Sequence, residues 1–344
     1  MPRELVAVAP RQPVIREYEE PKLQPRQVRV RSEFSAPKHG TELAAYRGIS
    51  PFSAGRYDRD LCLFLPEESR RERFPMPLGN MTVGVVTEVG ISVGKFKAGD
   101  RVFGHLPIRE THSVDAERLH PAPEGMSPEA IVCWDPAEFA LGAVRDANVR
   151  LGERVAVFGL GAIGLMAVQM ARLSGATTVI AVEPIERRRT LAFELGADHA
   201  LDPTTCDVAV EIKYLTGKKG VDVAIEASGN YGALHQAIRC VHFAGLVVPL
   251  AFYTGEARGL RLGEEWHMNR ITMRSSRSIS DPSRDHPMWD QDRIKWTAFD
   301  LLRGGKVSAQ GVVSPIVPFE ESAEAYRRID EAPHESVKLG VRYG

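Results

Sequence analysis

The chain has 344 residues, of which 43% are hydrophobic and 26% charged, the composition of an ordinary globular protein with a length that suits two domains. Its 44 basic and 45 acidic side chains give a formal net charge of −1. Without an excess of basic residues, the sequence offers little for a nucleic acid or a membrane surface to bind. We therefore expect a cytoplasmic protein with no nucleic-acid partner and no membrane association.

The cysteine spacing excludes one class of metal site. The four cysteines, Cys62, Cys133, Cys206 and Cys240, are at least 34 residues apart. A structural zinc or a redox dithiol needs closely spaced cysteine pairs, and the sequence contains none.

The first part of the chain, residues 1–127, predicts a domain built from strands. Residues 27–31 alternate strictly between polar and apolar side chains, and residues 83–89 form a mostly apolar run that a glycine ends. A Gly-Asp turn precedes another strand at residues 101–103. Short strands separated by Pro and Gly are typical of a small β-barrel or sandwich.

Residues 128–293 alternate between strand and helix patterns. Strands are expected at residues 155–158, 179–182, 200–201, 221–225, 246–250 and 271–274, with helices at 162–173, 186–195, 209–215 and 232–241. Short apolar strands that alternate with helices predict an α/β domain, a doubly wound parallel sheet with helices on both faces. A helix at residues 294–303 then begins a segment, residues 294–344, that we expect to return to the first domain.

A glycine motif, Gly-Leu-Gly-Ala-Ile-Gly, follows the first of these strands and opens the first helix. Its first glycine permits a tight turn, its second lets the backbone approach a pyrophosphate, and its third lets the helix pack against the strand. The pyrophosphate would rest on the N-terminus of the helix. We therefore predict that Gly159, Gly161, Ala162, Ile163 and Gly164 bind a dinucleotide.

Glu183 is the expected acidic partner of this motif. It lies 19 residues after Gly164, at the end of the second predicted strand. Its carboxylate can accept both ribose hydroxyls and would repel a 2′-phosphate, which favours NAD as the cofactor. The alternatives are that Glu183 is a solvated acid at a strand end, and that Arg187 and Arg188 select NADP.

Together, several segments resemble the medium-chain dehydrogenase/reductase superfamily over essentially the whole chain. They are Gly40-Thr41-Glu42-Leu43, Tyr46-Arg47-Gly48, and residues 84–90, 99–102, 159–164, 194–198 and 226–229. The resemblance implies a GroES-like β-barrel substrate domain and a Rossmann cofactor domain. It also implies a homodimer or homotetramer in which the last Rossmann strand pairs with its symmetry mate. It assigns Arg188 to the adenine and places Glu183, Ser228 and Gly229 among the cofactor-binding residues.

The zinc ligands of this superfamily are where the sequence departs from it. His39 stands at the position of a cysteine ligand, the usual Gly-His-Glu reads Gly-Asn80-Met81, and the third ligand position holds Asp135. Asparagine is a poor zinc ligand. His39 and Asp135 could still bind a metal, but Asp135 has a competing interpretation as the N-cap of a helix with Pro at N1 and Glu at N3. We expect a zinc-independent enzyme with no metal site.

Without zinc, hydrogen-bond donors must stabilise the reacting oxygen and a titratable group must move the proton. Thr41 matches the position whose hydroxyl touches the substrate oxygen in this superfamily, and His39 is the nearby side chain that titrates near neutrality. The alternatives are an ordinary turn residue and a structural histidine. Tyr46, Asn80 and Asp135 complete the candidate catalytic residues, although Tyr46 could instead pack the barrel and Asn80 could cap a turn.

The leading hypothesis is therefore a zinc-independent, NAD-dependent oxidoreductase. It transfers a hydride between nicotinamide and a secondary alcohol or ketone of a small-molecule substrate, a polyol, sugar or cyclitol-like compound. One alternative is an NAD(P)H-dependent C=C reductase that resembles quinone and enoyl reductases. Another is a non-catalytic cofactor-binding protein.

Overall fold

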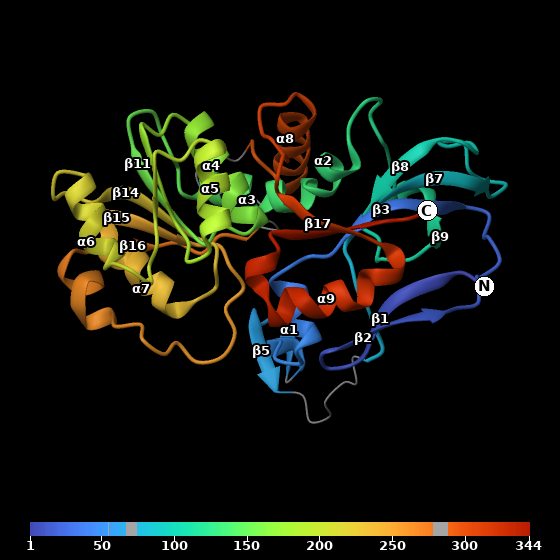
Figure 1. Ribbon diagram of the computed structural model, residues 1–344, viewed down its shortest axis with the longest axis horizontal. Helices are drawn as coiled ribbons and strands as arrows, with labels where there is room; N and C mark the ends of the chain where they lie inside the picture. The colour runs from blue at the N-terminus through green and yellow to red at the C-terminus, as the bar shows by residue number, and fades with distance from the viewer. Residues whose placement is uncertain (54, 67–73, 278–287) are drawn as a thin grey trace. The chain divides into compact units, whose positions relative to one another are not determined.

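The computed structural model describes residues 1–53, 55–66, 74–277 and 288–344. The chain forms two compact units: unit 1 comprises Met1–Val132 and Val313–Gly344, and unit 2 comprises Cys133–Val312. Unit 2 is therefore inserted between the two segments of unit 1. In Figure 1, unit 1 combines the N-terminal segment, coloured from blue to green, with the red C-terminal segment, and unit 2 runs from green to orange.

The boundaries of these units differ from the predicted ones near residues 127 and 294. Helix α2 (Pro128–Val132) contacts the strands of unit 1. Helix α8 (Gln291–Arg303), which was expected to begin the return to the first domain, packs on α3 (Trp134–Asp146) in unit 2. The Trp134 indole N–H donates to the Lys295 carbonyl at 2.8 Å. The packing on α3 buries the apolar face of α8. The helical periodicity alone could not assign that face to either unit.

Unit 2 confirms the predicted parallel sheet. Its strands, in spatial order, are β13 (His199–Leu201), β12 (Thr178–Val182), β11 (Arg154–Phe158), β14 (Val221–Glu226), β15 (Val241–Pro249) and β16 (Thr272–Met273). The order reverses between β11 and β14, and ligands of such sheets bind at that point beyond the carboxyl ends of the strands. The strand β16 lies at one edge of the sheet, and the pairing of two copies there stays a prediction.

The helices of unit 2 cover both faces of this sheet. They are α3, α4 (Ala162–Leu173), α5 (Glu186–Glu194), α6 (Val208–Leu215), α7 (Tyr231–Cys240), the π-helical turn η3 (Leu262–Trp266) and α8. Helix α4 contacts β11 and β12, while α7 contacts β14 and β15 and packs on α6 (Figure 1). The central strands β11, β12 and β14 are buried on both faces, which is why they read as mostly apolar runs.

Unit 1 is built mainly from strands, as expected for the GroES-like domain. Its larger sheet has the order β10 (His120–Pro121), β8 (Arg101–Gly104), β7 (Met81–Val89), β3 (Gln27–Ala36), β18 (Lys338–Arg342) and β17 (Val313–Pro318), and β9 (Thr111–Asp115) also pairs with β3. The other strands are β2 (Gln12–Glu17), β1 (Arg3–Ala9) and β6 (Met76–Pro77) in one sheet, and the hairpin of β4 (Gly55–Asp58) and β5 (Leu63–Pro66).

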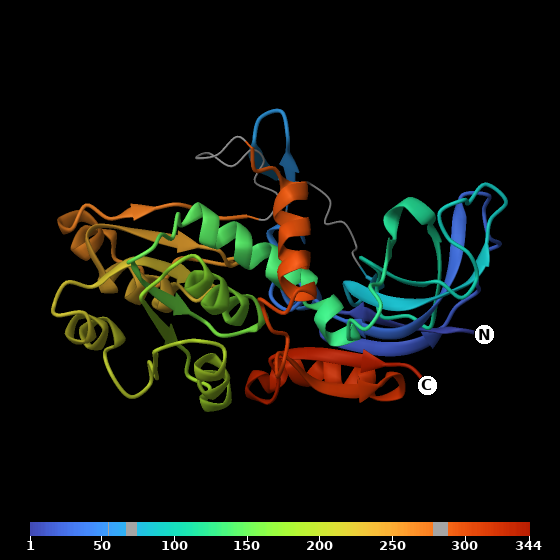
Figure 2. The same ribbon diagram turned by 90° about the horizontal axis from the view of Figure 1, so that it is seen from above.

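The helices of unit 1 are short. They are α1 (Thr41–Tyr46), α2, α9 (Ser322–Glu331) and the 3₁₀ turns η1 (Pro51–Ser53), η2 (Ala116–Arg118), η4 (Phe319–Glu321) and η5 (Pro333–Glu335). The C-terminal strand β18 pairs with both β3 and β17, so the last strand of the chain lies inside the larger sheet. Figure 2 shows this C-terminal segment in red beside the blue N-terminal strands.

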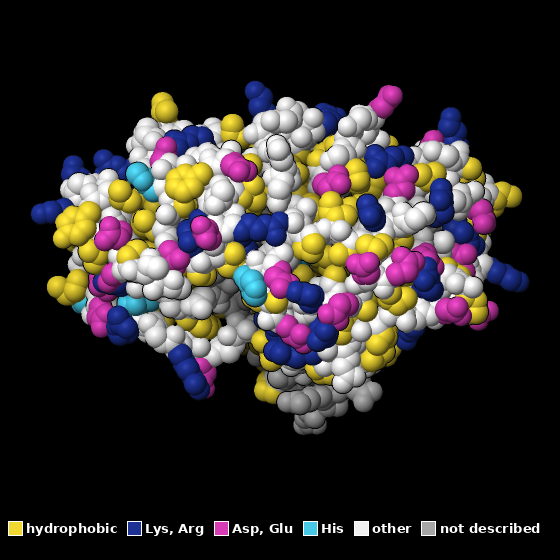
Figure 3. Space-filling model, in the orientation of Figure 1, with side chains coloured by type: hydrophobic (Ala, Val, Ile, Leu, Met, Phe, Trp, Pro, Cys, Tyr) yellow, Lys and Arg dark blue, Asp and Glu magenta, His cyan; other side chains and the backbone are white. Residues whose placement is uncertain are grey.

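The surface carries both signs of charge. On the face in Figure 3, Lys and Arg side chains lie among Asp and Glu side chains. Within the described ranges, no helix combines the length and the apolar character that crossing a bilayer requires.

The buried His112 in β9 makes the stability of unit 1 depend on pH. Its side chain is inaccessible, and burial, together with the nearby Arg109 cation, lowers its pKa to about 3. Histidine in an unfolded chain titrates near 6.5, so the unfolded state holds more protons between about pH 6.5 and 3. The free energy of unfolding should therefore fall as the pH falls through this window, by up to about 1.4 kcal/mol per pH unit from this group.

The substitution His112→Phe should remove this contribution while it fills a similar volume. Urea unfolding of both proteins between about pH 7 and 4 measures the slope. If the free energy of unfolding depended on pH in the same way in the wild type and the variant, His112 would not be the source of the pH dependence.

Candidate functional site

The glycine motif of unit 2 forms a turn between β11 and α4. Gly159 adopts a φ of 83°, and a Cβ on Gly164 would lie 1.9 Å from the Gly159 carbonyl oxygen, so the helix approaches the strand as closely as predicted. A Cβ on Gly161 would meet no atom within 4 Å. The first turn of α4, at Ala162 and Ile163, carries N–H groups without intrahelical partners. This turn therefore has both the open space and the donors that a pyrophosphate needs.

Glu183 connects the end of β12 to this turn. Its carboxylate accepts the N–H of Leu160 at 2.7 Å and the N–H of Ile185 at 3.2 Å, and only 4% of the residue is exposed. The Arg188 guanidinium lies 3.7 Å from the carboxylate, and burial lowers the pKa of Arg188. A carboxylate has about four acceptor positions, so capacity for ribose hydroxyls remains. The solvated alternative for Glu183 is wrong, because the side chain is buried.

A second buried carboxylate, Glu226, ends β14 beside the turn. Its Oε1 accepts the Ser228 N–H at 2.8 Å and also the Ser228 hydroxyl, while its Oε2 accepts the Gly229 N–H at 3.1 Å and the Tyr253 hydroxyl. Burial raises the pKa of Glu226 and of Tyr253. A Cβ on Gly159 would lie 2.7 Å from the Ser228 Cβ, so Ser228 packs on the glycine turn.

The structure thus brings most predicted cofactor-binding residues of unit 2 to one edge of the sheet. Sequence reasoning cited Glu226 only as part of a motif and did not identify Tyr253. The signal for Glu226 was present, because an acid at the end of a buried strand needs donors and the following Ser-Gly turn provides them.

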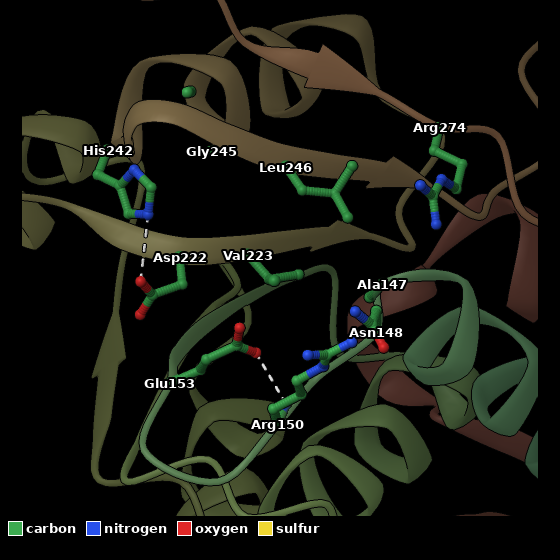
Figure 4. Close-up of a pocket in the computed structure, with 11 residues that line it drawn as sticks. Ala147, Asn148, Arg150, Glu153, Asp222, Val223, His242, Gly245, Leu246 and Arg274 are labelled. Atoms are coloured by element: carbon green, nitrogen blue, oxygen red, sulfur yellow. Dashed lines mark hydrogen bonds and ion pairs between the residues drawn. The ribbon is translucent and has the colours of Figure 1, made fainter. Parts of the chain in front are cut away.

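A pocket of about 380 Å³ lies at the amino ends of the strands of the same sheet, near the beginnings of β11, β14 and β15. Figure 4 shows its charged lining. His242 lies 3.1 Å from Asp222, and the Arg150 N–H donates to Glu153 at 2.8 Å. The Arg274 guanidinium donates to the carbonyl of Asp146 at 2.9 Å. Among these side chains His242 and Asp222 pair with each other, and no residue of the glycine turn lines the pocket.

In unit 1, the predicted segment around His39 begins helix α1. Thr41 is the first residue of the helix and is exposed, and Gly40 precedes it with a φ of 78°. His39 is partly buried, and its Nε2 accepts the Leu339 N–H at 3.3 Å. Leu339 belongs to β18, so the imidazole joins two segments of unit 1. This contact supports the alternative that His39 is a structural histidine.

Glu42 joins the parts of this segment and was not among the predicted site residues. Its Oε1 accepts the Tyr326 hydroxyl at 2.6 Å and the Gly79 N–H at 3.0 Å, and its Oε2 accepts the Lys38 N–H at 3.3 Å. Burial raises the pKa of Glu42, while hydrogen bonds and the Lys338 cation oppose this effect. Glu42 therefore ties the turn that contains Asn80 to the helix that Thr41 begins.

Asn80 and Tyr46 differ in accessibility. Asn80 is partly exposed and follows Gly79 directly, next to the Glu42 contact. Tyr46 is 0% exposed and packs edge-on against Tyr326 with ring centroids 5.0 Å apart. Burial raises the pKa of Tyr46 to about 12, and its hydroxyl has no hydrogen-bond partner among the described residues. Tyr46 is thus a core residue, and the packing alternative is the one that the structure supports.

The N-cap interpretation of Asp135 is wrong. Helix α3 begins at Trp134, with Cys133 at the N-cap, so Asp135 lies inside the first turn. The preceding helix α2 ends at Val132, which leaves a single residue in which the chain turns. An acid in the first turn still interacts favourably with the helix dipole, and a proline there removes no needed N–H. Asp135 is buried and belongs to unit 2.

Comparisons with known proteins show which proteins this chain is similar to. A family model described as zinc-binding dehydrogenase matches residues 162–292. The D-guloside 3-dehydrogenase of Escherichia coli (strain K12) is 41% identical, over 99% of this chain and 100% of that protein. The (R,R)-butanediol dehydrogenase of Bacillus subtilis (strain 168) is 32% identical, over 76% of this chain and 78% of that protein.

A solved structure extends the likeness. The crystal structure of 2R,3R-butanediol dehydrogenase from Bacillus subtilis matches with a TM-score of 0.78 and 27% identity, and the match covers 99% of each chain. The likeness thus extends over the residues of both units.

The family description names zinc, so the predicted ligand positions need a test. Catalytic zinc takes three strong ligands from Cys, His and carboxylates. In unit 1, His39 already accepts a backbone N–H at Nε2, and Asn80 offers an amide. The remaining position is Asp135 in unit 2. One imidazole, one amide and one carboxylate do not match the donor set of a catalytic zinc.

The fit of the glycine turn to a dinucleotide can be tested at Gly161. Gly161→Ala should leave the fold intact, because its φ of −68° is ordinary and its Cβ meets no atom. The added methyl occupies the space predicted for the pyrophosphate, so NADH affinity should fall at least about tenfold, or about 1.4 kcal/mol. Fluorescence titration with NADH and thermal unfolding measure the two effects.

Gly142→Ala is the matched control, since its Cβ also meets no atom within 4 Å but lies in α3. This variant should bind NADH as the wild type does. Unchanged NADH affinity in Gly161→Ala would show that the pyrophosphate does not bind at this turn.

Proposed function

Because the chain belongs to the zinc-binding, medium-chain alcohol and polyol dehydrogenase family, we propose that it transfers a hydride between NAD and a secondary hydroxyl, or the corresponding ketone, of a sugar or glycoside. The observation that carries the substrate class is the 41% identity, along essentially the whole chain, to a D-guloside 3-dehydrogenase. The 32% identical relative is named for a diol, which also has secondary hydroxyls.

The preference for NAD is supported by the environment of Glu183. Two backbone N–H groups hold its buried carboxylate next to the glycine turn. A 2′-phosphate brought to this position would meet a like charge with little solvent to screen it, which costs several kcal/mol by order of magnitude. The nearby Arg188 lies 3.7 Å from Glu183 and is partly neutralised by it.

A nicotinamide cofactor bound at the glycine turn supplies the hydride acceptor or donor. The chain must then bind the reacting oxygen and move its proton. We assign the first task to the exposed hydroxyl of Thr41, at the start of α1. We assign the second task to His39, which lies two residues before it.

The hydrogen bond from Leu339 opposes proton transfer to His39 by a small free energy. To accept a proton at Nε2, the imidazole must give up its hydrogen bond from the Leu339 N–H, which costs about 0.5–1.5 kcal/mol. General acid–base catalysis contributes about 10²–10⁴-fold in rate, which corresponds to about 2.7–5.4 kcal/mol. The gain exceeds the cost, so the hydrogen bond is compatible with proton transfer.

The substrate prediction can be tested with a panel of alcohols. The purified protein, treated with chelator, should oxidise glycosides that carry a free secondary hydroxyl, and NAD should bind at least about tenfold more tightly than NADP. Methyl glycosides of different configuration, free sugars, polyols and butanediol complete the panel. Formation of NADH measures turnover, and Glu183→Ala should narrow the preference for NAD.

Two outcomes would contradict separate parts of this proposal. Loss of activity in chelator that zinc restores would exclude zinc independence. Reduction of quinones or enoyl compounds without any alcohol oxidation would replace the proposed reaction with C=C reduction.

The catalytic assignment predicts the effect of removing one group at a time. Thr41→Val and His39→Ala should each lower kcat by about 10²–10⁴-fold while NADH affinity stays unchanged. Thr41→Ser keeps the hydroxyl and should retain activity.

His39→Gln is the decisive control for His39. It keeps an acceptor for the Leu339 N–H but cannot titrate, so its kcat should stay low and the limb of the pH–rate profile due to an imidazole should be absent. Wild-type kcat in His39→Gln would make His39 a structural residue.

A further inference from the structure

Helix α7 of unit 2 carries a buried histidine, His235. His235 is 4% exposed, and neither of its ring nitrogens has a hydrogen-bond partner among the residues that the structure describes. A neutral imidazole carries one donor and one acceptor, and leaving such groups unpaired in a protein interior costs free energy. Each such group in a folded protein calls for an explanation, an ion or water included.

Two carboxylates of η3 face this imidazole. The His235 Nε2 lies 3.9 Å from an oxygen of Glu264, and one atom from each of His235, Glu264 and Glu265 lies within 4.8 Å of the others. The Oε2 of Glu265 is also buried and without a hydrogen-bond partner in the described part of the chain. The unpaired acceptor and the unpaired imidazole thus lie in one cluster, contributed by two separate elements.

Basic side chains hold both carboxylates of the cluster in place. Arg261 donates to Glu264 at 2.8 Å, and Arg239 donates to Glu265 at 3.3 Å. Arg239 also pairs with Asp207 at 2.8 Å. Lys213 also interacts electrostatically with Glu265, so the three carboxylates face two guanidinium groups and one ammonium group. Each guanidinium holds its carboxylate in place through one oxygen, and on Glu264 this is the oxygen nearest His235.

We propose that His235, Glu264 and Glu265 form a binding site for an exchangeable divalent transition-metal ion. Two ligand atoms, each about 2.1 Å from a zinc ion, can be at most about 4.2 Å apart, and the 3.9 Å separation of His235 and Glu264 is already within this limit. One imidazole with two carboxylates suits Zn²⁺, Co²⁺ or Mn²⁺ rather than Mg²⁺ or Ca²⁺.

The ion would connect α7 to η3. Between β15 and η3, the chain carries Tyr253, whose hydroxyl donates to Glu226. The metal would therefore stabilise the segment that holds the Ser228 turn in place, without supplying a group to the reaction. Because both carboxylates also bind a guanidinium, the ion should exchange and should be removed by dialysis against a chelator.

Titration of the metal-free protein with Co²⁺ tests the site. The wild type should bind one Co²⁺ per chain, with a visible absorption that Zn²⁺ competes away, and its thermal unfolding midpoint should rise with Co²⁺ concentration. Glu264→Gln changes a half-exposed residue and should weaken binding at least about tenfold. His235→Ala should abolish both the absorption and the rise of the midpoint.

Two control variants locate the ion. Glu256→Gln changes an exposed acid that pairs with Arg258 in the preceding segment, and it should bind Co²⁺ as the wild type does. His39→Ala should also bind Co²⁺ normally. Each of three results would overturn the proposal. The wild type fails to saturate with Co²⁺, Glu264→Gln and His235→Ala both bind Co²⁺ as tightly as the wild type, or His39→Ala loses Co²⁺ binding.

Discussion

Backbone N–H groups at the ends of strands and turns have no partner in the sheet. In this protein, three carboxylates accept such groups: Glu183 and Glu226, which are buried, and Glu42, which is partly buried. Glu183 accepts two such groups and Glu226 two more in unit 2. Glu42 accepts another two in unit 1. A buried carboxylate is costly unless donors surround it, and a buried N–H is costly unless an acceptor reaches it. Each pairing removes both costs and fixes a turn.

These fixed turns coincide with the candidate site residues. Glu183 holds the residue between the first two glycines, Glu226 holds the Ser228 turn, and Glu42 holds the turn before Asn80. A binding group placed on a loop is useful only where the scaffold restricts the loop. The carboxylates therefore supply rigidity at positions where the chain leaves regular structure.

The features that the sequence predicted are local. The glycine turn depends on the positive φ of Gly159 and on Gly164, whose missing side chain lets α4 approach the Gly159 carbonyl oxygen, and both features lie within six residues of chain. The contacts of Glu42 were not predictable in this way, because its partner Tyr326 is 284 residues away. The N-cap prediction for Asp135 was wrong for a different reason. Its local pattern fits a helix start, but α2 ends at Val132 and α3 has begun before Asp135. The packing of Tyr46 was not predictable either, because the local sequence does not reveal that the distant Tyr326 packs against it.

The long-range contacts also determine when unit 1 can form its candidate segment. Tyr326 reaches Glu42, Leu339 reaches His39, and the Lys338 ammonium donates to the Pro37 carbonyl at 2.7 Å. All three partners lie after unit 2 in the chain, whereas the segment they contact lies before it. During synthesis, residues 37–42 therefore stay without these partners until the last strand is available, and closing so long a loop is slow. Unit 2, whose sheet uses only residues between Cys133 and Val312, has no such requirement. The glycine turn of unit 2 can thus form before residues 37–42 gain these partners, although residues 37–42 come first in the sequence.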